Sequence, residues 1–424
     1  MRVVIICHFS NETVRSKLRF APYHEKYNDS ANWITTIING LKYREDIELH
    51  IVAPHRGIHP KIQEFEYDDV HYHFFRRYIL PPFDKLERRF FPQDKKGFPK
   101  YRSQIRSFIA KIQPDIVNLI GAENAYYASA ALDFNDIPVF VHCQTVYANP
   151  ERKGKTGKVD PIRWNTEIQI FNHVTYYACT GQLYYDLIKS YQPKAIIFPR
   201  KWPSMPYPEI PEVEKRYDFV FFARYLNKNK GFDNALEAMG LFTQAYPEVR
   251  LLAVGGRDNE WSKYESRIKE LGLEKNLEIH ESFPEYKDLL RYVKQARFAL
   301  LPITMDVISG TILEAMRMGM PVVTCRTSGT PLLNKERETV LISEIGDFEG
   351  LFQNMKRLFD TENLQNALRE NAFIYLKEEE AKNARNVDAM IAQYKAVIAH
   401  YREGVPVPQE LLFRIENNKS NNEV

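Results

Sequence analysis

The sequence has few cysteines and no long apolar stretch. Its four cysteines are scattered over 424 residues and show neither the spacing of a metal site nor the pattern of a disulfide framework. We therefore expect reduced thiols and a cytoplasmic protein. No apolar run approaches the roughly 18 residues that a membrane-spanning helix needs. The first residues have the pattern of a short strand and not that of a signal peptide.

Motifs of several well-known enzyme classes are also missing. The sequence contains no H-E-x-x-H, no Walker A loop and no G-x-G-x-x-G, which disfavours zinc proteases, P-loop ATPases and dinucleotide oxidoreductases. It has no Asp-x-Asp pair to hold a divalent cation on a diphosphate. We therefore expect no cofactor, and protein cations in place of a metal ion.

An excess of one charge is lacking too. The chain has 58 lysines and arginines against 55 aspartates and glutamates, a net charge of +3 that does not indicate a nucleic-acid-binding protein. Its length favours two domains of roughly 200 residues. A proline cluster in the middle predicts a linker. We expect one domain over residues 1–200, the linker over 201–214, a second domain over 215–385, and a last helix with a frayed tail over 386–424, returning toward the first domain.

Both halves alternate strand-length apolar runs with helical patterns. The predicted strands of the first half cover residues 3–7, 48–53, 115–120, 138–142, 174–179 and 195–199. Those of the second half cover residues 218–223, 250–254, 277–280, 297–301 and 320–324. Strands that alternate with helices form parallel sheets. The sequence therefore predicts an α/β fold of two doubly wound, Rossmann-like domains facing each other across a cleft.

Residues 71–106 interrupt this alternation and mix basic with aromatic side chains. Such a mixture suits an anionic surface, either lipid headgroups or a nucleic-acid backbone. The alternative is an aromatic-rich hairpin or helix pair, partly buried, with a solvated basic face. We keep both interpretations, and for the first we expect peripheral contact with the inner membrane face.

Residues 298–324 form a strand, a polar loop, a short helix and another strand. Asp306 lies in the loop and Glu314 in the first turn of the predicted helix. Open α/β sheets bind ligands at the carboxyl ends of their strands, and the start of a helix suits an anion such as a diphosphate. The structural alternative is a capping box of Thr311 and Glu314, with Asp306 as a solvated turn residue.

Two cations follow the first strand of the second half. Arg224 stands at the carboxyl end of that strand, and Lys230 just before the next helix. We expect both to reach the rim where the helix at Gly310 begins, where they would neutralise the charge of a leaving diphosphate. For Lys230 the alternative is a solvated turn. In the first half His142 ends a strand, either near the cleft or as a satisfied structural residue.

The spacing of these segments resembles that of the family 4 retaining glycosyltransferases, of the GT-B class with two Rossmann domains. The resemblance rests on Ala223-Arg224 with Lys230-Gly231, on AVGG ending at Gly256, and on EAMRMGMPVV from Glu314. The first half matches more loosely, through IVNLIGAEN, IPVFVHCQT and YACTGQ. The resemblance implies metal-independent transfer of a sugar from a nucleotide sugar to a carbohydrate or lipid-linked acceptor, with retention of configuration, in surface polysaccharide or glycolipid synthesis.

The resemblance also implies a diphosphate site. Arg224 and Lys230 would bind the diphosphate of the donor. Backbone amides near Ser309, Gly310 and Thr311 would complete the cradle.

It implies further roles as well. Glu314 would hold the ribose hydroxyls, and Asp306, which stands where the family has a glutamate, would contact the donor sugar. His142 would lie near the reacting face of the sugar. Gly255 is a candidate for the nucleotide rim and Glu123 for the acceptor side. A sugar-nucleotide epimerase or hydrolase, and a non-catalytic nucleotide-sugar-binding protein, stay open as alternatives.

Overall fold

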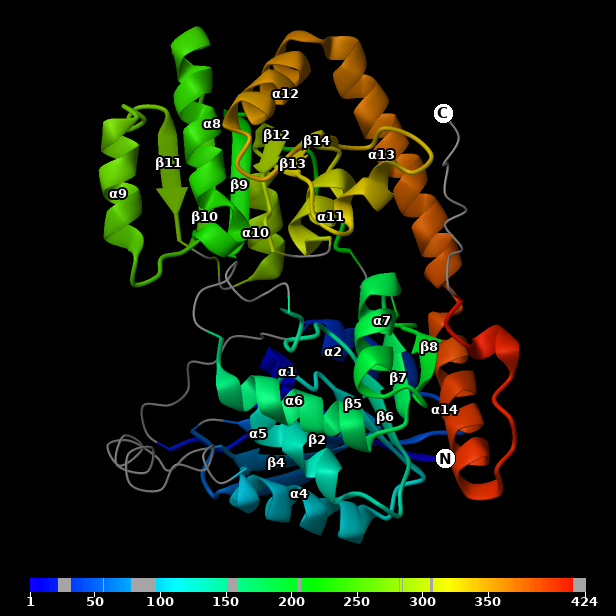
Figure 1. The fold of residues 1–424 in the computed structure, drawn as a ribbon. Coiled ribbons are helices and arrows are strands. Elements are labelled where there is room, and N and C mark those ends of the chain that lie inside the picture. The colour runs from blue at the N-terminus through cyan, green and yellow to red at the C-terminus, as the bar shows by residue number, and fades with distance from the viewer. Residues whose placement is uncertain are drawn as a thin grey trace. The chain divides into compact units, whose positions relative to one another are not determined.

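The computed structural model describes residues 1–21, 32–55, 57–77, 97–150, 159–203, 207–281, 283, 285–305 and 308–414. Contacts divide the chain into two compact units (Figure 1). The N-terminal unit consists of Met1–Pro206 with Asn383–Val424, and the C-terminal unit of Tyr207–Lys382. The first boundary falls inside the expected linker, and the last segment belongs to the N-terminal unit.

The N-terminal unit is built on an eight-stranded sheet of order β3-β4-β2-β1-β5-β6-β7-β8. Its strands are β1 (Arg2–Ile6), β2 (Glu48–His55), β3 (Ile62–Tyr67), β4 (Val70–Arg76), β5 (Ile116–Ile120), β6 (Val139–His142), β7 (Tyr176–Cys179) and β8 (Ile196–Pro199). All neighbours pair in parallel except β3 and β4. The chain winds from β1 to one side and then to the other, so the strand order reverses between β1 and β5.

Helices bury both faces of this sheet, which explains the nearly continuous apolar runs of its central strands. They are α1 (Glu12–Arg15), α2 (Asn32–Leu41), α4 (Pro99–Ile112), α5 (Ala125–Ala128), η2 (Ser129–Asp133), α6 (Pro161–His173), α7 (Gln182–Tyr191), α14 (Asn386–Glu403) and η6 (Gln409–Leu411). The last helix belongs to this core, because Met390 and Tyr394 of α14 are buried against residues of β1 and β6.

The C-terminal unit has a six-stranded, fully parallel sheet of order β11-β10-β9-β12-β13-β14. Its strands are β9 (Tyr217–Tyr225), β10 (Leu251–Gly256), β11 (Leu277–His280), β12 (Ala296–Leu301), β13 (Val322–Cys325) and β14 (Leu341–Ser343). Its helices are η4 (Lys228–Lys230), α8 (Phe232–Ala245), α9 (Trp261–Glu270), α10 (Tyr286–Val293), α11 (Gly310–Arg317), η5 (Thr330–Asn334), α12 (Phe348–Asp360) and α13 (Glu362–Asn383). Here the order reverses between β9 and β12. The prediction of two doubly wound sheets is confirmed.

The described ends of the basic and aromatic segment belong to the N-terminal core. Phe74 and Phe75 lie in β4, and Tyr101 in α4, all at most 3% exposed. Arg102 and Arg106 pair with Asp133. These ends therefore agree with the buried hairpin-and-helix interpretation, whereas residues 78–96 lie outside the described residues. Within the described part of the chain, no helix combines the length and apolar character needed to cross a membrane.

Candidate functional site

The strand-end edge of the C-terminal unit holds the candidate site. Because β10, β9 and β12 are adjacent and parallel, their carboxyl ends meet at one edge of the sheet. The reversal between β9 and β12 makes this edge the position where doubly wound sheets bind ligands. Arg224 is exposed and is the second-last residue of strand β9, at this edge. The guanidinium group lies 5.7 Å from the centre of the Tyr225 ring.

The loop that carries Lys230 is fixed to the loop that follows β12. Gly231 adopts φ +80°, and a Cβ there would lie 1.8 Å from the carbonyl oxygen of Pro302. Thr304 donates its hydroxyl to the carbonyls of Lys228 and Asn229, each at 3.1 Å. These contacts hold η4 beside the segment that leads into α11. The structure therefore brings Lys230 to the same strand-end edge as the start of α11.

The start of α11 is exposed at Gly310, whereas Ser309 before it is 4% exposed. Ser309 is the N-cap residue, its side chain makes no capping hydrogen bond, and its hydroxyl lies 3.0 Å from that of Thr311. Gly310 is exposed, and a Cβ added to it would meet no atom within 4 Å. The first amides of a helix have no partner inside the helix and carry a partial positive charge. This turn can therefore receive an anion.

Glu314 does not cap its own helix, so the capping-box alternative is wrong. Its carboxylate accepts a hydrogen bond of 2.6 Å from the hydroxyl of Tyr286, at the start of α10. Burial raises the pKa of Glu314, while the Tyr286 hydrogen bond and the charge of Arg317 oppose that shift. A partly buried carboxylate held by one donor keeps acceptor positions for a second polar partner.

Replacing Glu314 by alanine is expected to weaken the binding of a nucleoside diphosphate by roughly 1–3 kcal/mol, because a hydrogen bond to a charged group is lost. Isothermal titration measures the change. Tyr286→Phe is the matched control, since it removes the observed partner of the carboxylate and leaves the carboxylate itself. Equal losses in both variants would show that Glu314 acts only by holding Tyr286.

The structure does not support a binding role for two other predicted residues of this unit, Asp306 and Gly255. Asp306 lies outside the described residues, so its predicted contact with the donor sugar stays a prediction. Gly255 is the second-last residue of β10, and a Cβ there would come within 2.4 Å of the Ala223 carbonyl oxygen. Close packing of β9 against β10 therefore explains this glycine, and its place at a nucleotide rim is untested.

His142 is buried in the core of the N-terminal unit and does not line an exposed surface. Its exposed fraction is 0%, and its Nδ1 donates to the side-chain oxygen of Asn118 at 2.6 Å. The ring packs against Phe140, Trp202 and Tyr394. Burial, with a contribution from Arg200, lowers the pKa of His142 to about 3. The expectation that it lies near a reacting sugar is therefore corrected, because a fully enclosed ring contacts no substrate.

The candidate acceptor residue Glu123 belongs to a buried acidic pair of the N-terminal unit. Glu123 follows β5, is 4% exposed, and accepts a hydrogen bond from Asn124 at 3.2 Å. Glu167 of α6 is 0% exposed and accepts the backbone amide of Ala148 at 2.5 Å. Burial raises the pKa of Glu167 to about 8, the amide opposes this, and the charge of Glu123 adds to it. Glu167 is therefore a neutral acid at pH 7.

Glu167 is expected to make the protein less stable as the pH rises. Between the unfolded pKa near 4.5 and the folded pKa near 8 the native state holds a proton that the unfolded state has released, so stability falls across this range. From pH 6 to pH 8 the loss is roughly 2–3 kcal/mol. Urea unfolding of wild type and Glu167→Gln at both pH values tests this. A variant with the same pH slope as wild type would contradict it.

Several residues of the candidate sites were missed by sequence reasoning. Thr304 positions the η4 turn that carries Lys230, and Tyr286 positions Glu314. In the sequence they are only a polar residue after a strand and an aromatic residue at the start of a helix. In the N-terminal unit, His8 follows β1, and its Nδ1 lies 3.2 Å from the hydroxyl of Tyr126. The guanidinium of Arg77 lies 3.5 Å from the centre of the same Tyr126 ring. His8 directly follows the predicted strand 3–7, which was the usable signal for it, whereas Arg77 follows β4, a strand that the sequence analysis did not predict.

The architecture itself defines a class. Solved structures with the same fold include sucrose-phosphate synthase from Thermosynechococcus elongatus, with a TM-score of 0.70 and 15% identity over 94% of this chain and 99% of that chain. Another is described as trehalose-6-phosphate from E. coli bound with UDP-2-fluoro glucose, with a TM-score of 0.65 and 10% identity over 93% of this chain and 99% of that chain. Both comparisons show a GT-B fold of two Rossmann-like domains.

Comparisons of the sequence also find similarity to glycosyltransferases. Residues 207–374, within the C-terminal unit, match the family "Glycosyl transferases group 1". An uncharacterized glycosyltransferase of Haemophilus influenzae is 26% identical over 144 residues, 33% of this chain and 39% of its own length. A trehalose phosphorylase of Grifola frondosa is 32% identical over 84 residues, 20% of this chain and 12% of its own length. The chain thus spans well under half of either relative.

Together these findings support a glycosyltransferase of the GT-B fold. The part of the chain that matches the family contains β9, η4, β10, β12 and α11, and hence the whole candidate site of the C-terminal unit. Membership of family 4 is not tested by them and stays a prediction.

Proposed function

We propose that this protein is a retaining glycosyltransferase that moves a sugar from a nucleoside diphosphate sugar to an acceptor in surface polysaccharide or glycolipid synthesis. One observation carries the proposal. Thr304 and Gly231 tie the Lys230 loop to the segment entering α11, so that a cation and an open helix start share one strand-end edge. This pairing suits a pyrophosphate, whose charge needs cationic and amide partners.

The proposed mechanism needs these groups at the moment of bond cleavage. As the glycosidic bond to the diphosphate breaks, negative charge accumulates on the leaving oxygen, and fixed donors lower the barrier most when they are aimed there. We assign this role to Arg224, Lys230 and the amides of Ser309, Gly310 and Thr311. In the resembled family the acceptor attacks on the face that the diphosphate leaves, and the diphosphate accepts the proton of the acceptor. No metal ion is required when protein cations supply the positive charge.

Glu314 is proposed to fix the nucleoside. Its carboxylate lies on the same helix as the proposed phosphate cradle, one turn after Gly310. A carboxylate accepts hydrogen bonds from two neighbouring ribose hydroxyls without any change of protonation. The ribose would then lie beside the diphosphate, which is the order in which a nucleoside diphosphate presents these groups.

A nucleotide panel tests the proposal. Thermal unfolding of the full chain would be measured with UDP, GDP, ADP and CMP and with their sugars, beginning with UDP because one GT-B neighbour is described with a UDP sugar. A ligand at 100 times its Kd stabilises the protein by about 2.7 kcal/mol. The proposal expects one nucleoside diphosphate to raise the unfolding temperature, and NMR of the product to show the anomeric configuration of the donor. An inverted product would contradict retention, and the absence of any shift would contradict nucleotide binding.

A further inference from the structure

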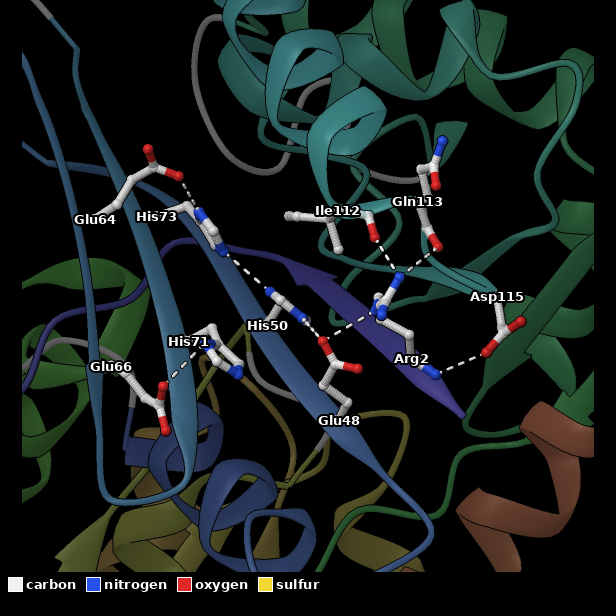
Figure 2. A network of polar contacts seen from close by, with 10 residues as sticks. All are labelled: Arg2, Glu48, His50, Glu64, Glu66, His71, His73, Ile112, Gln113 and Asp115. Carbon is white, nitrogen blue, oxygen red and sulfur yellow. Dashed lines mark hydrogen bonds and ion pairs between the residues drawn. The ribbon is translucent and has the colours of Figure 1, made fainter.

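A second cluster of reactive side chains lies in the N-terminal unit and shares no residue with the candidate site of the C-terminal unit. It gathers three histidines and three glutamates from three neighbouring strands: Glu48 and His50 of β2, His71 and His73 of β4, and Glu64 and Glu66 of β3 (Figure 2). These residues line one cavity of about 430 Å³ together with Arg2 and Lys111. The proposed glycosyl transfer uses none of them.

The strand register explains why these side chains meet. His50 is the direct partner of His71 in the parallel β2–β4 pair. In the antiparallel β3–β4 pair, His71 faces Glu66 and His73 faces Glu64. Side chains two positions apart lie on the same face of a strand. The alternating pattern of each strand therefore puts all six groups on one face of the sheet.

Four of these groups form a hydrogen-bonded chain. Glu64 contacts Nδ1 of His73 at 2.7 Å, Nε2 of His73 contacts Nδ1 of His50 at 3.0 Å, and Nε2 of His50 contacts Glu48 at 2.9 Å. A carboxylate only accepts, and a neutral imidazole has one N–H donor. Two neutral rings therefore supply protons for two of the three contacts. The third contact needs one further cation, either a proton or a metal ion.

The position of His71 is compatible with a metal ion. The His71 ring stacks on that of His50 with ring centres 4.6 Å apart, which puts a third possible ligand beside the His50–Glu48 contact. The ligating atoms of Glu48, His50 and His71 all lie within 4.8 Å of one another. Zinc lies about 2.0–2.2 Å from its nitrogen and oxygen ligands. Two ligand atoms of one zinc ion are therefore somewhat closer to each other than 4.8 Å. The His71 side chain is 37% exposed and its contact with Glu66 is 3.6 Å long, so the ring is only loosely held in its present orientation.

We propose that Glu48, His50 and His71 bind a divalent transition metal ion, with zinc as the best chemical match. Two imidazoles and one carboxylate are a known zinc ligand set that leaves a position for water. The second nitrogen of His50 contacts His73, which in turn contacts Glu64. A ligating histidine is usually oriented through its second nitrogen in this way. The guanidinium group of Arg2 lies 3.0 Å from the carboxylate of Glu48 and partly offsets its negative charge.

The metal would act as a clip within the sheet. It would join the start of β2 to the start of β4, the strand that carries the edge hairpin partner β3. Glu48 begins β2 and His55 ends it. At about 3.3 Å per residue the clip lies roughly 20 Å from the carboxyl ends of these strands. Binding is therefore expected to change the stability of the N-terminal unit and to leave glycosyl transfer unchanged.

Calorimetric titration of the chelator-treated full chain with zinc chloride tests the proposal, and cobalt(II) serves as a spectroscopic probe. We expect one ion per chain, a higher unfolding temperature, and the visible absorption of a nitrogen- and oxygen-ligated cobalt ion. His71→Gln should lower the affinity at least 10-fold. Glu64→Gln, which removes no ligand and reaches His50 only through His73, should lower it by less than His71→Gln does. His173→Gln, an exposed histidine at the end of α6, is the matched control and should bind as wild type does.

Three outcomes would overturn the proposal. The first is no zinc binding by the folded wild-type chain, which would leave an excess proton as the third cation. The second is zinc binding that His71→Gln does not weaken although the variant unfolds at the wild-type temperature without metal. The third is an equal loss of affinity in His173→Gln, which would show dispersed surface binding.

Discussion

Replacing Lys230 by alanine is expected to lower kcat about 100- to 1000-fold, the loss seen when one preorganised donor to a developing anion is removed. The cation lies on a short 3-10 turn that Thr304 and Asn227 fix in place. Its removal should leave the fold intact, because the side chain contributes to no buried core. Steady-state kinetics with the sugar nucleotide identified in the nucleotide panel, and urea unfolding, measure the two quantities.

Lys228→Ala is the matched control for this prediction. Lys228 belongs to the same turn and its side chain is exposed. Its backbone carbonyl, which accepts from Thr304, is unchanged by the substitution. The kcat of the Lys228→Ala variant should stay within a few-fold of wild type. Similar losses in both variants would mean that the turn acts through its general positive charge, and the assigned diphosphate role of Lys230 would be wrong.

Gly231→Ala is expected to destabilise the C-terminal unit by roughly 3–5 kcal/mol, since it combines a left-handed backbone with an overpacked contact. The glycine has φ +80°, and the added Cβ would lie 1.8 Å from the Pro302 carbonyl oxygen, which belongs to the backbone and cannot rotate aside. The η4 turn must therefore move away from β12. Urea unfolding measures the stability, and the affinity for the nucleoside diphosphate should fall in the same variant.

Gly272→Ala separates the two causes. Gly272 has a similar φ of +66°, but a Cβ there would meet nothing within 4 Å. Only the backbone cost remains, about 1 kcal/mol. If Gly231→Ala lowers the free energy of unfolding by no more than Gly272→Ala does, the close contact between Gly231 and the Pro302 carbonyl does not constrain the η4 turn.

The sequence predicted the regular part of the fold well, because its signals are local. Continuous apolar runs located the central strands of both sheets, and the strand–helix alternation determined their parallel order. The segment 71–106 was harder. Its described ends form β4 and the first half of α4, whose apolar positions are diluted by arginines and lysines that point to solvent or pair with Asp133. Helix α6 has a similarly weak signal in the sequence, since polar residues interrupt its apolar face.

The candidate site was predicted in outline and not in its contacts. Arg224, Lys230 and Glu314 could be placed near one edge because each follows a strand or begins a helix. The partner of Glu314 could not, since Tyr286 comes from a helix 28 positions earlier in the chain. The burial of His142 also depends on Tyr394, far along the chain in α14. Contacts between distant segments leave no local pattern.

The cluster of β2, β3 and β4 shows the same limit. Glu48 with His50, and His71 with His73, are ordinary alternating pairs in the sequence. Only the register of the strands brings His50 against His71. A one-residue shift would place these rings on opposite faces of the sheet.

Hydrogen–deuterium exchange of the full chain, with and without the nucleoside diphosphate identified in the panel, tests the central claim most directly. The account predicts slower exchange of amides in residues 224–231 and 308–314, and loss of this protection in Lys230→Ala at the same ligand concentration. Protection confined to other segments, or protection of these two segments that Lys230→Ala leaves unchanged, would contradict a diphosphate site at the start of α11.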